Sequence, residues 1–136
     1  MSSSPQSQLL SKAMVLFGLI FSIGLPILNR FWPSGWDWHP AQPAYWQMIV
    51  SIYFTLGVCL LFGSRDPARS LSLVWFTVWS SLAHAGVMAV HSFTDPGEMG
   101  HLWGDVAALV LVALVLAPLA RAVGQQAGGG LASARA

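Results

Sequence analysis

The stretch from residue 71 to residue 93, LSLVWFTVWSSLAHAGVMAVHSF, contains no Asp, Glu, Lys or Arg. A helix needs about 20 predominantly apolar residues to cross a hydrocarbon core about 30 Å thick. Three other stretches have a comparable character, so the expected spans are about 12–28, 45–62, 67–93 and 97–120. The sequence therefore predicts an all-α integral membrane protein, an antiparallel four-helix bundle over residues 12–121.

The composition agrees with a membrane protein. Only 8% of the 136 residues are charged and 55% are hydrophobic, whereas soluble proteins have about 25% charged residues. The net charge of +1 and the scattered Lys and Arg residues argue against nucleic-acid binding. A single cysteine, Cys59, excludes a disulfide framework. The expected partners are the lipid bilayer and either a second copy or another membrane protein.

The ends of the chain and its orientation follow from composition. Residues 1–11 and the Gly-rich and Ala-rich residues 122–136 are expected to be disordered. Basic residues outside the spans mark the cytoplasmic side of a membrane protein. All but Arg30 fall on one side of the predicted spans, namely Lys12, Arg65, Arg69, Arg121 and Arg135. Both termini are therefore predicted in the cytoplasm, and the protein in the bacterial cytoplasmic membrane as a multi-pass protein.

Two turns carry helix-start signals. In GSRDPARS, Asp66 precedes Pro67, and in TDPGE, Asp95 precedes Pro96, a pairing typical of an N-cap followed by the first helical residue. Glu98 completes the pattern of a capping box with Asp95. Tryptophans near the turns predict an aromatic belt at one membrane surface. These tryptophans are Trp32, Trp36, Trp38, Trp46 and Trp103.

Small residues four apart predict where helices pack, because they allow close backbone approach in lipid. The second span offers Ser51, Thr55, Cys59 and Gly63, and the third offers Thr77, Ser81, Ala85 and Ala89. These two rows are expected to form the seam of an antiparallel hairpin. Gly18 and Ser22 on the first span, and Gly104 and Ala108 on the last, would complete the packing.

Polar residues gather at the outer end of the third and fourth spans. If the fourth helix starts at Pro96, Glu98, His101 and Asp105 lie on one stripe. His91 is expected at the depth of His101 and Asp105, with His84 deeper on the same face. An acid within a span is a candidate functional residue, because a charge in hydrocarbon costs about 2.5–3.5 kcal/mol on insertion scales. The first loop brings Arg30, Asp37 and His39 to this side.

Three interpretations of this cluster are open. In the first, Asp105 and Glu98 are paired with Arg30 and the histidines and tie the outer loops to the bundle. His91, His101 and Asp105 could instead bind zinc or copper. The third interpretation is a quinone, haem or small-substrate pocket whose cofactor-binding residues are His84, His101 and Asp105. A lone His84 could also bond only to Ser80, one turn away.

Enzymatic motifs are missing from the sequence, which contains no phosphate-binding glycine loop, H-E-x-x-H, G-x-S-x-G or C-x-x-C. The leading prediction is therefore a non-enzymatic structural or interaction bundle. The alternative is a redox or ligand-binding membrane protein that uses the His and Asp residues, with the cofactor unknown.

Several segments resemble a family of small bacterial four-helix membrane proteins of unassigned function. They are WPSGWDW, YWQMIVSIYFTLGVCLLFGSRDP, SLVWFTVWSSLAHAGVMAVHSF and GHLWGDVAALVLVALVLA, within residues 32–117. The resemblance implies a bundle in a bacterial membrane and supplies no substrate or cofactor. Members often carry Gln in place of His91, which weakens the three-ligand metal site. A looser similarity, in architecture and size, is to DoxX-like membrane proteins, some of them linked to quinone chemistry.

Overall fold

The computed structural model describes residues 4–36 and 43–133 and is all-α. A first helical rod consists of α1 (Pro5–Leu19), the π-helical η1 (Ile20–Gly24) and α2 (Leu25–Phe31), and the short η2 (Pro33–Gly35) follows it. Then come α3 (Pro43–Gly63) and α4 (Leu71–Thr94). The last part comprises η3 (Pro96–Glu98), the π-helical η4 (Leu102–Val106) and α5 (Ala107–Ser133).

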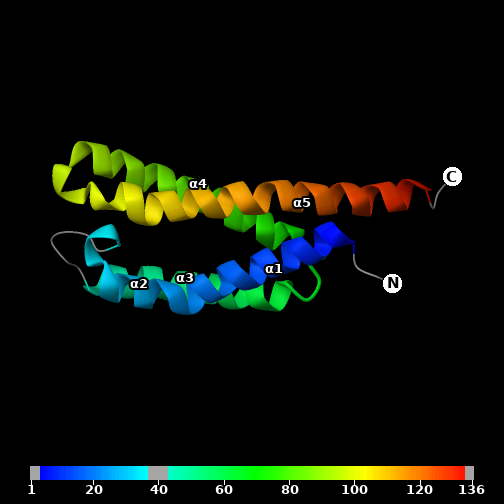
Figure 1. The fold of residues 1–136 in the computed structure, drawn as a ribbon, viewed down its shortest axis with the longest axis horizontal. Helices are drawn as coiled ribbons and strands as arrows, with labels where there is room; N and C mark the ends of the chain where they lie inside the picture. The colour runs from blue at the N-terminus through cyan, green and yellow to red at the C-terminus, as the bar shows by residue number, and fades with distance from the viewer. Residues whose placement is uncertain (1–3, 37–42, 134–136) are drawn as a thin grey trace.

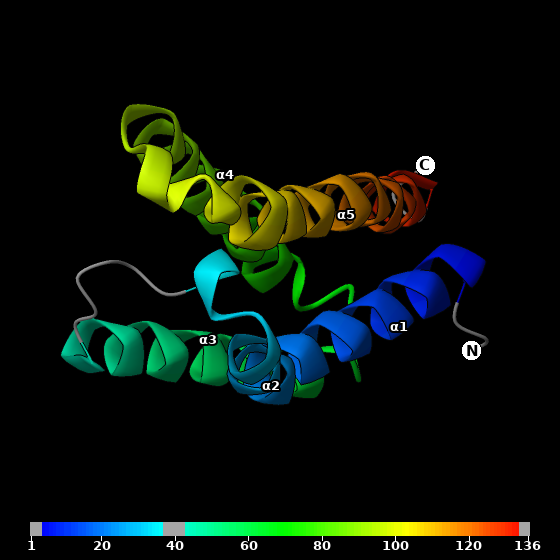
Figure 2. The ribbon, with the colours of Figure 1, turned by 60° about the vertical axis from the view of Figure 1, so that its left-hand side comes forward.

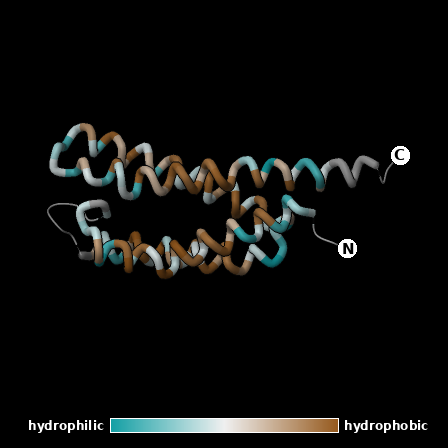
Figure 3. Tube along the Cα trace, viewed as in Figure 1, coloured by the Kyte–Doolittle hydropathy of each residue, from teal (hydrophilic) through white to brown (hydrophobic). Residues whose placement is uncertain are grey.

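Four helices in the described residues are long and apolar enough to cross a membrane, as predicted. They are Pro5–Phe31, Ala44–Gly63, Leu71–Thr94 and Leu102–Gly128. Hydrophobic residues dominate the middle of these helices, and hydrophilic ones collect at the turns (Figure 3). The N-terminal end of α1 and the C-terminal end of α5 lie at the same end of the bundle (Figure 1).

The helices form two layers, one of α1 and α3 and one of α4 and α5 (Figures 1 and 2). The layers meet mainly where α1 packs on α5. Large apolar side chains fill this junction, including Leu10, Met14, Leu60, Val74 and Leu116. Each layer is thus a pair of consecutive membrane-spanning helices, and the core lies between the pairs.

Gly57 sets the spacing inside the first layer. A Cβ atom on Gly57 would meet Ser22 Oγ, and would lie 2.6 Å from Gly18 O and 2.8 Å from Ser22 N. Because two of these neighbours are backbone atoms, the backbone of α3 at Gly57 lies directly against the backbone of the first rod. Gly18 and Ser22 therefore do serve in packing, as the sequence predicts, and Gly57 is the residue they contact.

The predicted hairpin seam between the second and third spans is wrong. Ser51, Thr55 and Cys59 are exposed, because α3 turns its Gly57 face toward the first rod instead. The row on α4 is buried at Thr77, Ser81 and Ala85, and the principal partner of α4 is α5. Ser51 and Thr55 satisfy their hydroxyls with their own helix, on Met48 O and Ser51 O respectively.

Both terminal helices are longer than predicted. Ser4 caps α1, since its Oγ accepts a hydrogen bond from the Ser7 amide at 3.2 Å, and Pro5 occupies the first helical position. At the other end α5 continues to Ser133, where the sequence predicts disorder. Ala120 and Val123 of α5 are buried in the core, which stabilises this continuation.

The first of the two turns also differs from its prediction. The α4 helix starts at Leu71 rather than at Pro67. Asp66 accepts a hydrogen bond from the Arg69 amide at 3.3 Å, so the residues after Pro67 form a separate hydrogen-bonded turn. The Asp-Pro signal thus marks a turn that precedes the helix.

The tryptophans divide into two groups. Trp103, in η4, is 77% exposed and Trp32, just before η2, is 41% exposed, and the aromatic belt stays a prediction. Trp36 instead packs against the core. Trp38, Asp37 and His39 lie outside the described residues.

Candidate functional site

A buried charged cluster occupies the end of the bundle opposite the termini, where α4 turns into α5. Glu98, His101 and Asp105 are all buried, and His101 has no exposed surface. Asp95 begins this turn by accepting a hydrogen bond from the Gly97 amide at 2.9 Å. The predicted capping box is wrong, because the Asp95 amide donates to His91 O and the Glu98 carboxylate lies against His101.

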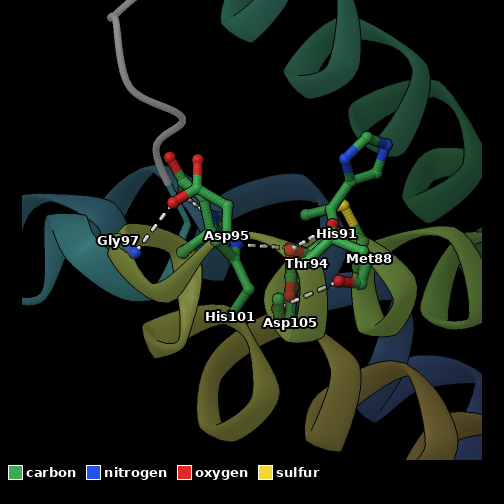
Figure 4. Close-up of polar contacts among 9 residues, drawn as sticks. Met88, His91, Thr94, Asp95, Gly97, His101 and Asp105 are labelled. Carbon is green, nitrogen blue, oxygen red and sulfur yellow. Dashed lines mark hydrogen bonds and ion pairs between the residues drawn. The ribbon is translucent and has the colours of Figure 1, made fainter.

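The imidazole of His101 lies between two carboxylates. Its Nδ1 is 3.0 Å from Asp105 Oδ2, and its Nε2 is 3.0 Å from Glu98 Oε2. The three residues belong to one segment, so the spacing predicted from the sequence does bring them onto one stripe. Asp105 lies in η4, a π-helical turn, and such turns often occur at functional sites. Figure 4 shows His101 beside Asp105.

The second oxygen of Asp105 is unusual. Asp105 Oδ1 is buried and has no hydrogen-bond partner among the residues that the structure describes. Buried polar atoms nearly always have a partner, and an unsatisfied one costs about 1–3 kcal/mol. This oxygen is therefore the atom of the cluster that could accept a further hydrogen bond.

His84 is joined to a neighbouring helix rather than to Ser80. The hydroxyl of Tyr53 on α3 is hydrogen-bonded to His84 Nδ1 at 2.9 Å, while Ser80 donates to Thr77 O. The rings of Tyr53 and His84 are tilted, with centroids 5.7 Å apart. Sequence reasoning missed Tyr53, although it carries a hydroxyl group in the middle of an otherwise apolar span.

The histidines predicted as ligands do not all come together. His101 and Asp105 are in contact, whereas His91 is exposed on α4 and its ring points away from that pair (Figure 4). Among the described residues, no group of three His, Cys, Asp or Glu side chains could hold a metal ion. The pairing of His101 with Glu98 and Asp105 thus uses the nitrogen atoms that a metal would need.

The charge of the cluster affects the titration of His101. Burial lowers the pKa of the imidazole, but the hydrogen bond to Asp105 and the charges of Asp105 and Glu98 raise it. The net result is a pKa above the ordinary 6.5. The protonated imidazole can donate to both carboxylates, which explains why the pKa of His101 is raised.

This shift predicts how stability depends on pH. Because the pKa of His101 is higher in the folded state, its contribution is complete below the unfolded value of 6.5 and is lost as pH rises through the raised pKa. We expect the difference in unfolding temperature between the parent and His101→Gln to shrink over that range. Thermal unfolding in detergent at a series of pH values measures it. A difference independent of pH would contradict the prediction.

The fold and the cluster together define the class of protein. Four packed, apolar helices in the described residues indicate a multi-pass membrane protein. The chain belongs to the family of unknown function DUF6632, whose model matches residues 3–135. No curated protein and no solved structure matches the chain.

Proposed function

We propose that the chain is a non-enzymatic scaffold of the bacterial cytoplasmic membrane with both termini in the cytoplasm. In this proposal the cluster holds the extracytoplasmic turn in one shape for contact with a partner. The distribution of basic residues supports the orientation, since Lys12, Arg65, Arg69 and Arg121 are exposed. The positive-inside rule places such residues on the cytoplasmic side.

The pairing of His101 carries the proposal. Each nitrogen of a fully buried imidazole lies 3.0 Å from a carboxylate of the same segment. Removing three ionisable groups from water costs free energy, so such a network serves conformational specificity better than it serves stability. Large exposed aromatic residues, Phe31, Phe93 and Trp103, stand near this end and would suit a contact with lipid, a second copy or another membrane protein.

Hydrogen exchange tests whether the cluster holds the turn. In Asp105→Asn, which weakens the bond to His101, we expect amides of residues 95–101 to exchange about tenfold faster or more. The turn at residues 64–70 should be unaffected. Mass spectrometry of the protein in detergent, with and without the substitution, measures both segments.

The control is Asp66→Asn in the inner turn. Asp66 and Arg69 form an exposed pair at 3.4 Å, which should contribute little to stability. This variant should leave exchange of residues 95–101 at the parent rate. Equal exchange in the parent and in Asp105→Asn would argue that the turn keeps its shape without the cluster.

A redox or ligand-binding function of His84, His101 and Asp105 is the second candidate. Asp105 Oδ1, which has no hydrogen-bond partner among residues 4–36 and 43–133, favours it, because a purely structural network would satisfy both oxygens. Elemental analysis and an absorption spectrum of gently purified protein test the metal and haem versions. A stoichiometric metal or a haem spectrum that disappears in His101→Ala would favour this candidate over the scaffold.

A further inference from the structure

Arg121 of α5 holds a positive charge about one helical turn inside the start of α4. A Cβ atom on Gly124 would lie 3.7 Å from Leu71 Cδ1, so Gly124 is level with the first residue of α4. Arg121 lies about one turn further into the bundle, and its guanidinium carbon is 5.9 Å from the centre of the Trp75 ring. In a bilayer this depth is the boundary between headgroups and hydrocarbon.

The charge of Arg121 has no acidic partner in residues 4–36 and 43–133. None of the ion pairs found among these residues includes Arg121, and the carboxylate of Asp66, at the same end, is already paired with Arg69. The side chain of Arg121 is exposed, and the ring of Trp75 covers only a face of its guanidinium. The N–H groups at the edge can therefore donate to an anion, for which phosphate has a matching geometry.

An exposed apolar stripe of α4 continues from this cation toward the middle of the membrane. The rings of Trp75 and Trp79 are stacked with centroids 6.4 Å apart, and Trp79 is 65% exposed. Residues three and four apart share a helix face, so the next turns carry the stripe onward. They contain a shallow groove, lined by Ala83, Gly86, Val87, Val90 and His91. The groove is open at Gly86, where a Cβ atom would meet nothing within 4 Å.

We propose that Arg121, the two stacked tryptophans and this groove bind one phospholipid with an anionic headgroup. The phosphate accepts hydrogen bonds from the guanidinium, and one acyl chain lies along α4 from Trp79 to Gly86. The dimensions agree, since α4 rises about 16 Å from Trp75 to Gly86 and one leaflet supplies about 15 Å of hydrocarbon. A zwitterionic phospholipid fits less well, because its own ammonium group offsets the charge of its phosphate.

Two phospholipids of different headgroup charge test the proposal. Phosphatidylglycerol is anionic, whereas phosphatidylcholine with the same acyl chains is zwitterionic. Native mass spectrometry of the purified parent in detergent measures how many molecules of each lipid stay bound as its concentration is raised. We expect one molecule of phosphatidylglycerol to bind with an affinity about tenfold or more above that of phosphatidylcholine. Equal affinities would overturn the proposal.

Glycerol 3-phosphate separates a lipid site from a general phosphate site, because it carries the phosphate without acyl chains. It should leave the bound phosphatidylglycerol in place when both are present at the same concentration. Displacement of the lipid would show that Arg121 binds free phosphate, and the proposed lipid site would be wrong.

Charge variants locate the headgroup. Arg121→Gln should lower the affinity for phosphatidylglycerol about tenfold or more. The matched control is Arg69→Gln, which removes the same charge from an exposed side chain that is paired with Asp66, and it should bind like the parent. Equal losses in the two variants would show that only the net charge of the protein matters, and would refute the site.

Gly86→Leu tests the course of the acyl chain, because its side chain would fill the groove. We expect binding of phosphatidylglycerol to weaken about tenfold, as when two CH₂ groups lose their contacts. Unchanged binding would contradict the proposed course. Arg121 and Gly86 are both exposed, so both variants should fold. The scaffold proposal is tested separately, by hydrogen exchange of the protein without added lipid.

Discussion

Gly57→Leu is expected to prevent the α1–α3 layer from assembling. The first atom of any side chain would meet Ser22 Oγ and would lie 2.6 Å from Gly18 O, which is backbone and can move only with its helix. Overpacking destabilises a protein by about 1–3 kcal/mol where side chains can adjust. Here backbone atoms block the new side chain, so we expect a loss of stability of about 3 kcal/mol or more. Size-exclusion chromatography and thermal unfolding in detergent measure the loss.

The same substitution at Gly86 is the matched control. A Cβ atom on Gly86 meets nothing within 4 Å, and the residue is exposed on α4. Gly86→Leu should therefore change stability by no more than about 0.5 kcal/mol, as surface substitutions usually do. A Gly57→Leu variant that elutes and unfolds like Gly86→Leu would show that the close helix approach is not needed.

His101→Ala should have the second large effect. It removes the group between Glu98 and Asp105 and leaves two buried carboxylates without the cation that pairs with them. Breaking a buried ion pair in this way costs about 3–5 kcal/mol. We expect a correspondingly lower unfolding temperature in detergent, while His91→Ala, which changes an exposed side chain, should resemble the parent.

A triple variant separates charge from packing. If the loss in His101→Ala comes from carboxylates that no longer face an imidazolium, adding Glu98→Gln and Asp105→Asn should recover part of it, because the remaining groups are neutral. If it comes from the missing imidazole volume, the triple variant should be no more stable than His101→Ala. Thermal unfolding of the three proteins side by side distinguishes the two causes.

The spans could be predicted because their signal is local. A long run without charge, such as residues 71–93, must cross the membrane as a helix whatever it packs against, and the structure has helix α4 there. The partners of each helix were harder to predict. On α3, the regular row of Ser51, Thr55 and Cys59 predicts the packing face, yet the single Gly57 lies at the contact. Spacing alone does not show which of two faces a neighbour covers.

The candidate functional site likewise contains one contact that the sequence could predict and others that it could not. The contact of His101 with Asp105 followed from their spacing, since both belong to one turn. The bond between His84 and Tyr53 joins different helices, and it depends on the relative height of α3 and α4. Sequence patterns do not encode that height. That Asp105 Oδ1 has no hydrogen-bond partner in the described part of the chain likewise required the structure, because it depends on what η4 packs against.

The closeness of Glu98, His101 and Asp105 along the chain bears on biogenesis. All three lie in one short segment, so their contacts can form as soon as that segment coils, before α3 or α1 is in place. Transfer from the insertion machinery into lipid then moves one paired unit instead of three separate polar groups. The final hairpin can thereby form before the two hairpins dock within the bilayer.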